Sequence, residues 1–197
     1  MRRALFVTLA SAIICLLLAG AASAGIAFAG IGGRVGYVKP EDPIEGTFGV
    51  GVVANLGTIV PALRLEGSVD YWAKSYNAAF MAHDAEWKYS DIIIGATAKY
   101  MIPTQGSVTP FVGGGLGVHV FNWEYSYDYE WDDPYGYLDE ECSDSCSDSK
   151  TEVGFHGVGG VEAKLSPNVT GGVEVRYAVS EVNHLGVFGT ITYNLIP

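Results

Sequence analysis

The chain has 197 residues, of which 49% are hydrophobic and only 17% are charged, and its formal net charge is −11. The excess of 22 acidic over 11 basic residues excludes the basic face that a nucleic-acid-binding protein needs. The apolar content excludes an acidic disordered chain, and the 26 glycines lack the period of three that collagen requires. A single domain rich in strands is expected at this length.

The first 24 residues have the pattern of a cleaved secretory signal peptide. Arg2 and Arg3 precede an almost entirely apolar run, and Ala22 and Ala24 occupy the −3 and −1 positions of an Ala-x-Ala cleavage site. The run is short for a transmembrane anchor, and no later stretch reaches 18 consecutive apolar residues. Cleavage after Ala24 would leave a domain of residues 25–197 with nine bases, 22 acids and a net charge of −13.

From residue 30 onward, apolar and polar residues alternate with a period of two, which is typical of strands with two different faces. Val173 and Val175, for example, alternate with Glu174 and Arg176. No stretch has the length and periodicity of a crossover helix, so antiparallel pairing is expected. Eight strands are predicted, at residues 30–39, 46–56, 62–73, 88–102, 110–122, 152–165, 170–179 and 185–195.

The connectors between these segments differ systematically in length. Those after the second, fourth and sixth segments are short, whereas two of the others, residues 74–87 and 123–151, are long. Tight turns at one end and longer loops at the other are typical of outer-membrane barrels. The predicted fold class is therefore all-β, an eight-stranded antiparallel up-and-down transmembrane β-barrel with both chain ends at the tight-turn end.

The polar face of the predicted strands carries equal numbers of positive and negative side chains. A closed interior requires such a balance, because an unpaired buried charge is very costly, whereas a solvated face does not. Eight strands leave a lumen that is just wide enough for side chains to fill. The predicted interior charge network consists of Arg34, Arg64, Glu66, Asp70, Asp91, Lys99, Glu162, Lys164, Glu174 and Arg176.

Two glycine-rich segments carry a family resemblance. Residues 111–118, with the sequence FVGGGLGV, resemble the fifth strand of OmpA/OmpX-like and opacity-type outer-membrane barrels, and residues 157–177 are similar to that family's sixth strand, turn and seventh strand. The resemblance covers nearly the whole chain after the signal peptide. It implies location in the outer membrane of a Gram-negative-type bacterium, with membrane lipid as a partner. Such barrels usually end on an aromatic residue, and here Leu195 is expected to take that place.

Residues 123–151 form the most unusual predicted loop. Together with Glu152 they contain 11 of the 22 acidic residues and a single base, Lys150, and loop length places them on the extracellular side. Aromatic residues alternate with polar ones at the start of the loop, which indicates that the fifth strand continues beyond the membrane. The aromatic side chains either bind an extracellular protein or other surface ligand, or simply cover the barrel mouth. These candidate surface-binding residues are Trp123, Tyr125, Tyr127, Tyr129 and Trp131.

The same loop contains Cys142 and Cys146, the only cysteines after the signal peptide. An even pair in an exported protein predicts a disulfide. The C-x3-C spacing without a nearby histidine is poor for zinc. The neighbouring carboxylates offer oxygen ligands to Ca²⁺ but lack the spacing of an EF-hand. We therefore expect no metal and no cofactor.

None of the four histidines lies in a serine-hydrolase motif, and only His119 and His156 are expected to share a level of the barrel. The predicted function is that of a non-enzymatic, monomeric outer-membrane barrel. Its role is structural or surface-binding and adhesin-like, through the acidic, tyrosine-rich loop. Two alternatives remain open: an exported soluble lipocalin-like barrel that carries a small apolar ligand, and a narrow pore for small solutes.

Overall fold

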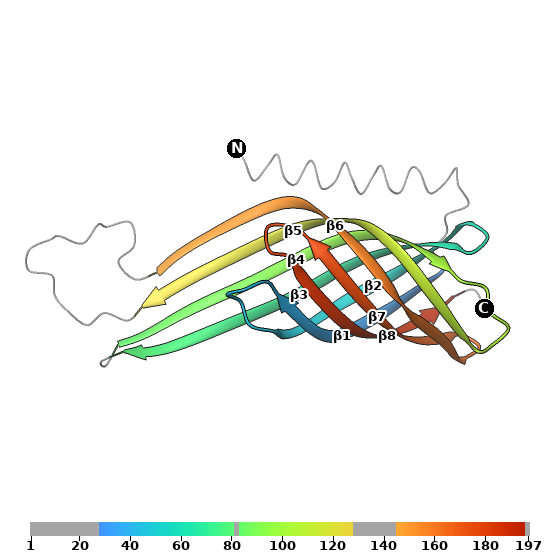
Figure 1. Cartoon of the computed structure of the whole chain (residues 1–197), viewed down its shortest axis with the longest axis horizontal. Coiled ribbons are helices and arrows are strands. Elements are labelled where there is room, and N and C mark those ends of the chain that lie inside the picture. Colours follow the sequence, from blue (N-terminus) through green and yellow to red (C-terminus); the bar gives the residue numbers. More distant parts are fainter. Residues whose placement is uncertain (1–27, 81–82, 128–144, 196–197) are drawn as a thin grey trace, which may run out of the picture.

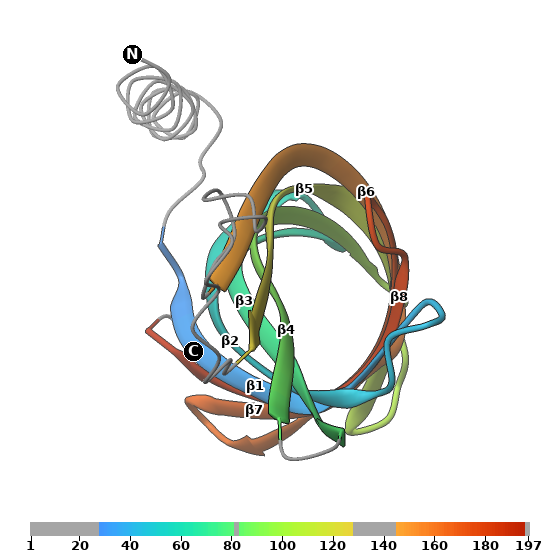
Figure 2. The same cartoon turned by 90° about the vertical axis from the view of Figure 1, so that its left-hand side faces the viewer.

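A computed structural model describes residues 28–80, 83–127 and 145–195. Eight antiparallel strands close into one barrel, in which β1 pairs with β8 and every other pair is consecutive in sequence (Figures 1 and 2). Among the described residues, no helix is long and apolar enough to cross a membrane. The strands are β1 (Gly30–Pro40), β2 (Thr47–Val60), β3 (Leu63–Phe80), β4 (His83–Met101), β5 (Val108–Tyr127), β6 (Ser145–Ser166), β7 (Val169–Val179) and β8 (His184–Asn194).

Side chains alternate between the inside and the outside of the barrel along the strands. In β7, Glu174 and Arg176 are buried in the lumen, whereas Val173, Val175 and Tyr177 are exposed on the outside. A soluble barrel has the opposite distribution, because its apolar face must fill the interior. The observed distribution contradicts the soluble lipocalin-like alternative and is that expected of a barrel in lipid.

Glycine is required where an inward-pointing side chain lies close against the backbone of the neighbouring strand. A Cβ atom on Gly154 would lie 2.9 Å from Nε2 of His119 and 2.8 Å from the carbonyl oxygen of Val179. A Cβ atom on Gly51 would overlap the carboxylate of Asp70. Part of the high glycine content therefore leaves room for polar side chains in a narrow lumen.

The wall of the barrel is taller on one side than on the other. β3 to β6 have 18 to 22 residues, whereas the other four strands have 11 to 14. The β2–β3 ladder ends at the pair Gly49 and Trp72, and the β6–β7 ladder ends at Phe155 and Val179. β3 to β6 then continue together beyond the barrel (Figure 1). We call this four-stranded extension the rim sheet; it comprises residues 73–80, 83–90, 122–127 and 145–152.

The prediction of eight antiparallel strands is confirmed, but two predicted connectors are wrong. Residues 74–87 are not a long loop, because β3 extends to Phe80 and β4 begins at His83. The predicted continuation of the fifth strand is observed as far as Tyr127, and β6 begins at Ser145, well inside the predicted loop. The outward face of these extensions is polar, so they lack the apolar row that identified the other strands. The predicted signal peptide and residues 128–144 lie outside the described residues.

Candidate functional site

A network of six buried charged side chains crosses the middle of the lumen. Its centre is Glu174, whose Oε1 accepts hydrogen bonds from Nη1 of Arg34 at 3.2 Å and from Nη2 of Arg176 at 3.0 Å. Nζ of Lys99 lies 2.6 Å from Oε2 of Glu174. The network joins β1, β3, β4 and β7 and consists of Arg34, Glu66, Asp70, Lys99, Glu174 and Arg176.

Further contacts connect Asp70 and Glu66 to this network. Arg34 donates from two of its nitrogens to both carboxylate oxygens of Asp70, and Lys99 donates to Oε2 of Glu66 at 2.8 Å. Three positive and three negative charges therefore cancel in a region that is buried from solvent. Such a network is tolerated inside a barrel because each desolvated charge is compensated by an opposite partner.

Nine of the ten predicted interior charges are buried or half-buried in the lumen, whereas Lys164 lies on the same row of β6 as Glu162 but at the open end of the barrel. Its side chain is exposed, because β6 ends two residues later at Ser166, where the barrel opens. Arg64 and Glu162 form a two-bond ion pair near the same end, with 2.9 Å between Nη1 and Oε2. Asp91 pairs with a residue that the prediction left out of the network, namely His119, whose Nδ1 lies 2.8 Å from Oδ2 of Asp91.

His119 and His156 do not share a level of the barrel, and that prediction is wrong. In the β5–β6 register, His119 lies opposite Glu152, and His156 lies opposite Gly115. The two histidines are therefore offset by four residues along the strands. Nε2 of His156 is instead 2.8 Å from Oγ1 of Thr97.

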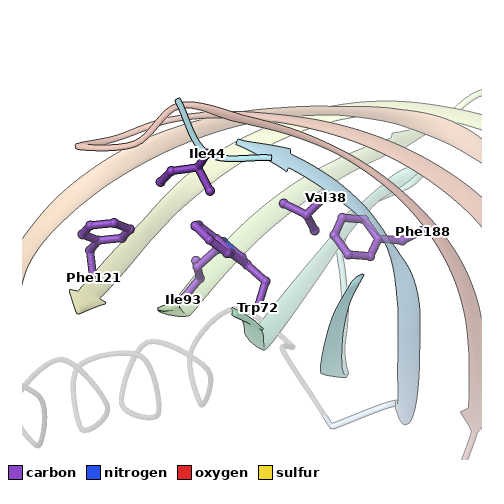
Figure 3. Packing of buried hydrophobic residues seen from close by; sticks show 6 residues of the cluster. All are labelled: Val38, Ile44, Trp72, Ile93, Phe121 and Phe188. Atoms are coloured by element: carbon purple, nitrogen blue, oxygen red, sulfur yellow. The ribbon is translucent and has the colours of Figure 1, made fainter. Parts of the chain in front are cut away.

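An apolar cluster fills the lumen between the charge network and the rim sheet. Trp72 is only 2% exposed, and its ring lies 6.2 Å from that of Phe121, measured between centroids. Ile44 joins the cluster from the connector between β1 and β2 and lies above the strand side chains (Figure 3). The lumen is thus blocked at two successive levels, one apolar and one charged. The cluster consists of Val38, Ile44, Trp72, Ile93, Phe121 and Phe188.

This packing predicts that the purified barrel conducts no ions. Reconstituted into a planar lipid bilayer, the folded protein should leave the current at the level of the bare bilayer. The apolar cluster offers no water-filled path, and the charges below it are already paired. A wide porin in the same lipid provides the positive control. Reproducible conductance steps from the folded protein would contradict this prediction and support the narrow-pore alternative.

The rim sheet reverses the polarity of the barrel wall. On the outside of β4 the residues change from Ile94 and Ile92 to Ser90, and on β5 they change from Val120 to Asn122. Because lipid requires an apolar surface and water does not, this change marks the end of the membrane-spanning part. The inner face of the rim sheet combines aromatic with charged side chains. The aromatic ones include Tyr76, Trp87, Tyr89, Trp123 and Tyr125, and the charged ones are Lys74, Asp148, Lys150 and Glu152.

These aromatic side chains form cross-strand pairs. Trp87 lies opposite Tyr125 in the register, with 5.2 Å between ring centroids, and Tyr76 contacts Tyr89 edge to face at 6.2 Å. Trp123 is 41% exposed. Aromatic pairs of this kind stabilise neighbouring strands.

Of the five candidate surface-binding residues, the structure places Trp123 and Tyr125 on this inner face. Tyr127 ends β5, and Tyr129 and Trp131 lie outside the described residues. The sequence prediction missed Tyr76, Trp87 and Tyr89 as members of the same surface. Trp87 and Tyr89 alternate with polar residues in the same register as the predicted fourth strand. This alternation could have indicated that the strand begins earlier and that both rings lie on its inward face.

Two ion pairs connect the rim sheet to the neighbouring connectors. Nζ of Lys74 is 3.0 Å from Oε2 of Glu45, and Lys150 pairs with Glu181. The hydrogen bond with Glu181 raises the pKa of Lys150. These connectors therefore hold the two sides of the rim sheet in place.

Cys146 lies at the start of β6 and is disulfide-bonded. Cys142 is outside the described residues, so the pairing of these two cysteines stays a prediction. In the part of the chain that the structure describes, no group of three or more His, Cys, Asp or Glu side chains is placed to hold a metal ion.

A closed eight-stranded barrel with an apolar outer belt and a charged interior is a membrane-spanning β-barrel. The chain belongs to the outer membrane protein β-barrel domain family, whose model matches residues 8–194. The protein is therefore an outer-membrane protein, and the predicted family and location are confirmed. No curated protein is matched significantly.

The chain is similar to several solved structures of small outer-membrane barrels. Neisserial surface protein A is 19% identical, with a TM-score of 0.55 over 84% of this chain and 96% of that one. OprG from Pseudomonas aeruginosa is 12% identical, with a TM-score of 0.49 over 87% and 98% of the two chains. Ail from Yersinia pestis, solved in complex with the heparin analogue sucrose octasulfate, is 14% identical, with a TM-score of 0.47 over 84% and 98%. The similarity to Neisserial surface protein A shows the fold alone.

Proposed function

We propose that this protein is a non-enzymatic, monomeric outer-membrane barrel that presents the rim sheet at the cell surface as a binding platform. Its role is adhesin-like and is carried by the acidic, tyrosine-rich segment of residues 123–151 together with the strands that support it. The observation that carries the proposal is the reversed polarity of the rim sheet. Above the lipid the inner face of the rim sheet carries aromatic side chains, of which Trp123 is 41% exposed, and exposed aromatic surface of this kind is typical of a binding site.

The short connectors support an extracellular position for the rim sheet. At the opposite end, the strands are joined by residues 61–62, 102–107 and 167–168. Outer-membrane barrels have short turns on the periplasmic side and longer segments outside. The exposed apolar belt below the rim sheet takes outer-membrane lipid as its partner.

The proposal predicts that shortening the loop abolishes surface binding without affecting assembly. Replacing residues 128–144 by a two-residue Asn-Gly turn should remove most of the retention of intact cells on plates coated with purified extracellular proteins. The barrel below the rim sheet is unchanged, so the variant should still show a heat-modifiable band on unboiled gels. Undiminished retention of cells that display the shortened protein would refute the binding role.

Orientation is tested separately with protease added to intact cells. Cleavage within residues 125–148 is expected, because the proposal places this segment outside the cell. Complete protection of intact cells, with cleavage only after lysis, would place the rim sheet on the periplasmic side.

A further inference from the structure

The end of the barrel opposite the rim sheet contains a cavity of about 240 Å³. It lies among the side chains of β3 to β8 at the end with the short connectors, on the right of Figure 1. The charge network closes the lumen above it, so the cavity opens only at this end of the barrel. We call it the turn-end cavity; its polar lining includes Arg64, Ser107, Thr109, Glu162, Lys164 and Thr170.

Three charged side chains line the turn-end cavity, and one of them is unpaired. Arg64 and Glu162 neutralise each other through their two-bond ion pair. Lys164 is exposed and forms no ion pair within the described residues 28–80, 83–127 and 145–195. The cavity therefore carries one net positive charge, on an ammonium group that is free to bind an anion.

Neutral polar groups complete the lining. The hydroxyl groups of Ser107 and Thr109 have no hydrogen-bond partner in the described part of the chain. Nδ2 of Asn194 donates to Oγ1 of Thr170 at 2.9 Å, which leaves the hydroxyl hydrogen of Thr170 and the amide oxygen of Asn194 for further bonds. Because these groups include both donors and acceptors, they suit the N–H and C=O groups of a peptide unit.

The size of the cavity limits what it can hold. Pockets for drug-sized ligands have volumes of about 300–1,000 Å³, and the turn-end cavity is smaller, at about 240 Å³. It therefore accommodates one or two residues at the end of a chain rather than a long segment. Met101, Ala163 and Pro167 form an apolar part of the lining that suits a small side chain.

The carboxylate of Glu162 determines which anion is favoured. Glu162 lines the same cavity as Lys164, two residues away on the same row of β6. A phosphate group carries a charge of about −1.5 to −2 at neutral pH, which exceeds the single positive charge and is repelled by Glu162. A carboxylate carries one negative charge and matches the cavity.

We propose that the turn-end cavity binds the terminal carboxylate of a peptide. Lys164 is the partner of the carboxylate, and the hydroxyl groups of Ser107 and Thr109 hold the last peptide unit. In the orientation proposed above, the cavity opens to the periplasm, so the ligand is the free end of a periplasmic peptide or protein. The site goes beyond the surface-binding role and is independent of it, because it contains none of residues 123–151.

The test uses the whole protein folded in nanodiscs, which leave both ends of the barrel accessible, with a ¹³C label on the methionine methyl groups. The probe is the dipeptide N-acetyl-alanyl-alanine, and its C-terminal amide is the matched control without a charge. The NMR signal of Met101, which lines the cavity, should shift saturably with millimolar dipeptide. The signal of Met81, between β3 and β4 in the sequence, should stay in place. The amide should bind about tenfold more weakly, because its contact with the ammonium group is lost.

Three results would overturn the proposal. The first is an unchanged Met101 signal at dipeptide concentrations up to about 20 mM, where even a weak specific complex is populated. The second is equal binding of the amide, because the carboxylate would then not be recognised. The third is inorganic phosphate binding as tightly as the dipeptide, because the cavity would then accept any anion.

Two matched lysine variants locate the site. Lys164→Gln removes the charge and should weaken dipeptide binding about three- to tenfold, an effect between those of exposed and buried charged contacts. The control, Lys88→Gln, removes the same charge from the exposed outward face of the rim sheet and should bind like the wild type. Equal affinities of the two variants would contradict the assignment of the carboxylate to Lys164. Both side chains are exposed, and heat modifiability on gels verifies that each variant is folded.

Discussion

Replacing Glu174 by glutamine should lower the free energy of unfolding by about 3–5 kcal/mol, the range found when one partner of a buried ion pair is removed. The substitution keeps the shape of the side chain but removes the carboxylate that contacts Arg34, Lys99 and Arg176. Three buried cations would then share two carboxylates. Urea unfolding of the barrel in lipid vesicles, followed by tryptophan fluorescence, measures the loss.

A second substitution tests the cause of this loss. Combining Glu174→Gln with Lys99→Met restores equal numbers of charges in the network, and we expect it to recover part of the lost stability, measured as a double-mutant cycle. Glu162→Gln, which affects only the partly exposed pair with Arg64, should cost less than Glu174→Gln. An unchanged unfolding curve for Glu174→Gln would show that the network contributes little to stability.

Introducing arginine at Ile94 should destabilise the barrel by about 2–4 kcal/mol, whereas arginine at Ser90 should cost at most about 1 kcal/mol. Both side chains belong to the outward row of β4, four residues apart. Ile94 lies in the apolar belt that contacts lipid, and Ser90 lies in the rim sheet, beyond the change of polarity. The pair therefore measures where lipid ends along one strand.

The same vesicle unfolding assay applies to both variants, with Ile94→Val as a control for the change in volume. Equal losses for arginine at the two positions would place the membrane boundary higher than the polarity of the outer face indicates. A small loss at both positions would mean that this part of β4 does not contact lipid.

All eight strands could be predicted from the period-two pattern, because in the membrane each strand faces lipid on one side and the lumen on the other. The pattern could not show that β3 continues as far as Phe80 or that β4 already begins at His83. Above the membrane the outer face meets water, so the apolar row disappears while the strand continues. A prediction that takes an apolar row as the sign of a strand therefore ends the strand where the lipid ends.

The members of the charge network were largely predictable, but their partners were not. Which residues face inward follows from the strand pattern alone. Which residues meet depends on the stagger between strands and on contacts across the lumen, as for Lys99 on β4 and Glu174 on β7. The pairing of His119 with Asp91, and the exposure of Lys164 at the end of β6, depend on the same geometry.

The unequal height of the wall also determines the direction from which a partner can arrive. On the tall side, β3 to β6 extend beyond the mouth of the barrel. On the opposite side, β1, β2, β7 and β8 end at the mouth (Figure 1). The aromatic face looks inward across that mouth. In the surface-binding role proposed above, a partner would lie over the opening and approach above the lower side of the wall, roughly parallel to the membrane plane. Neighbouring molecules in the same membrane therefore have as direct an access to the site as molecules arriving from the medium.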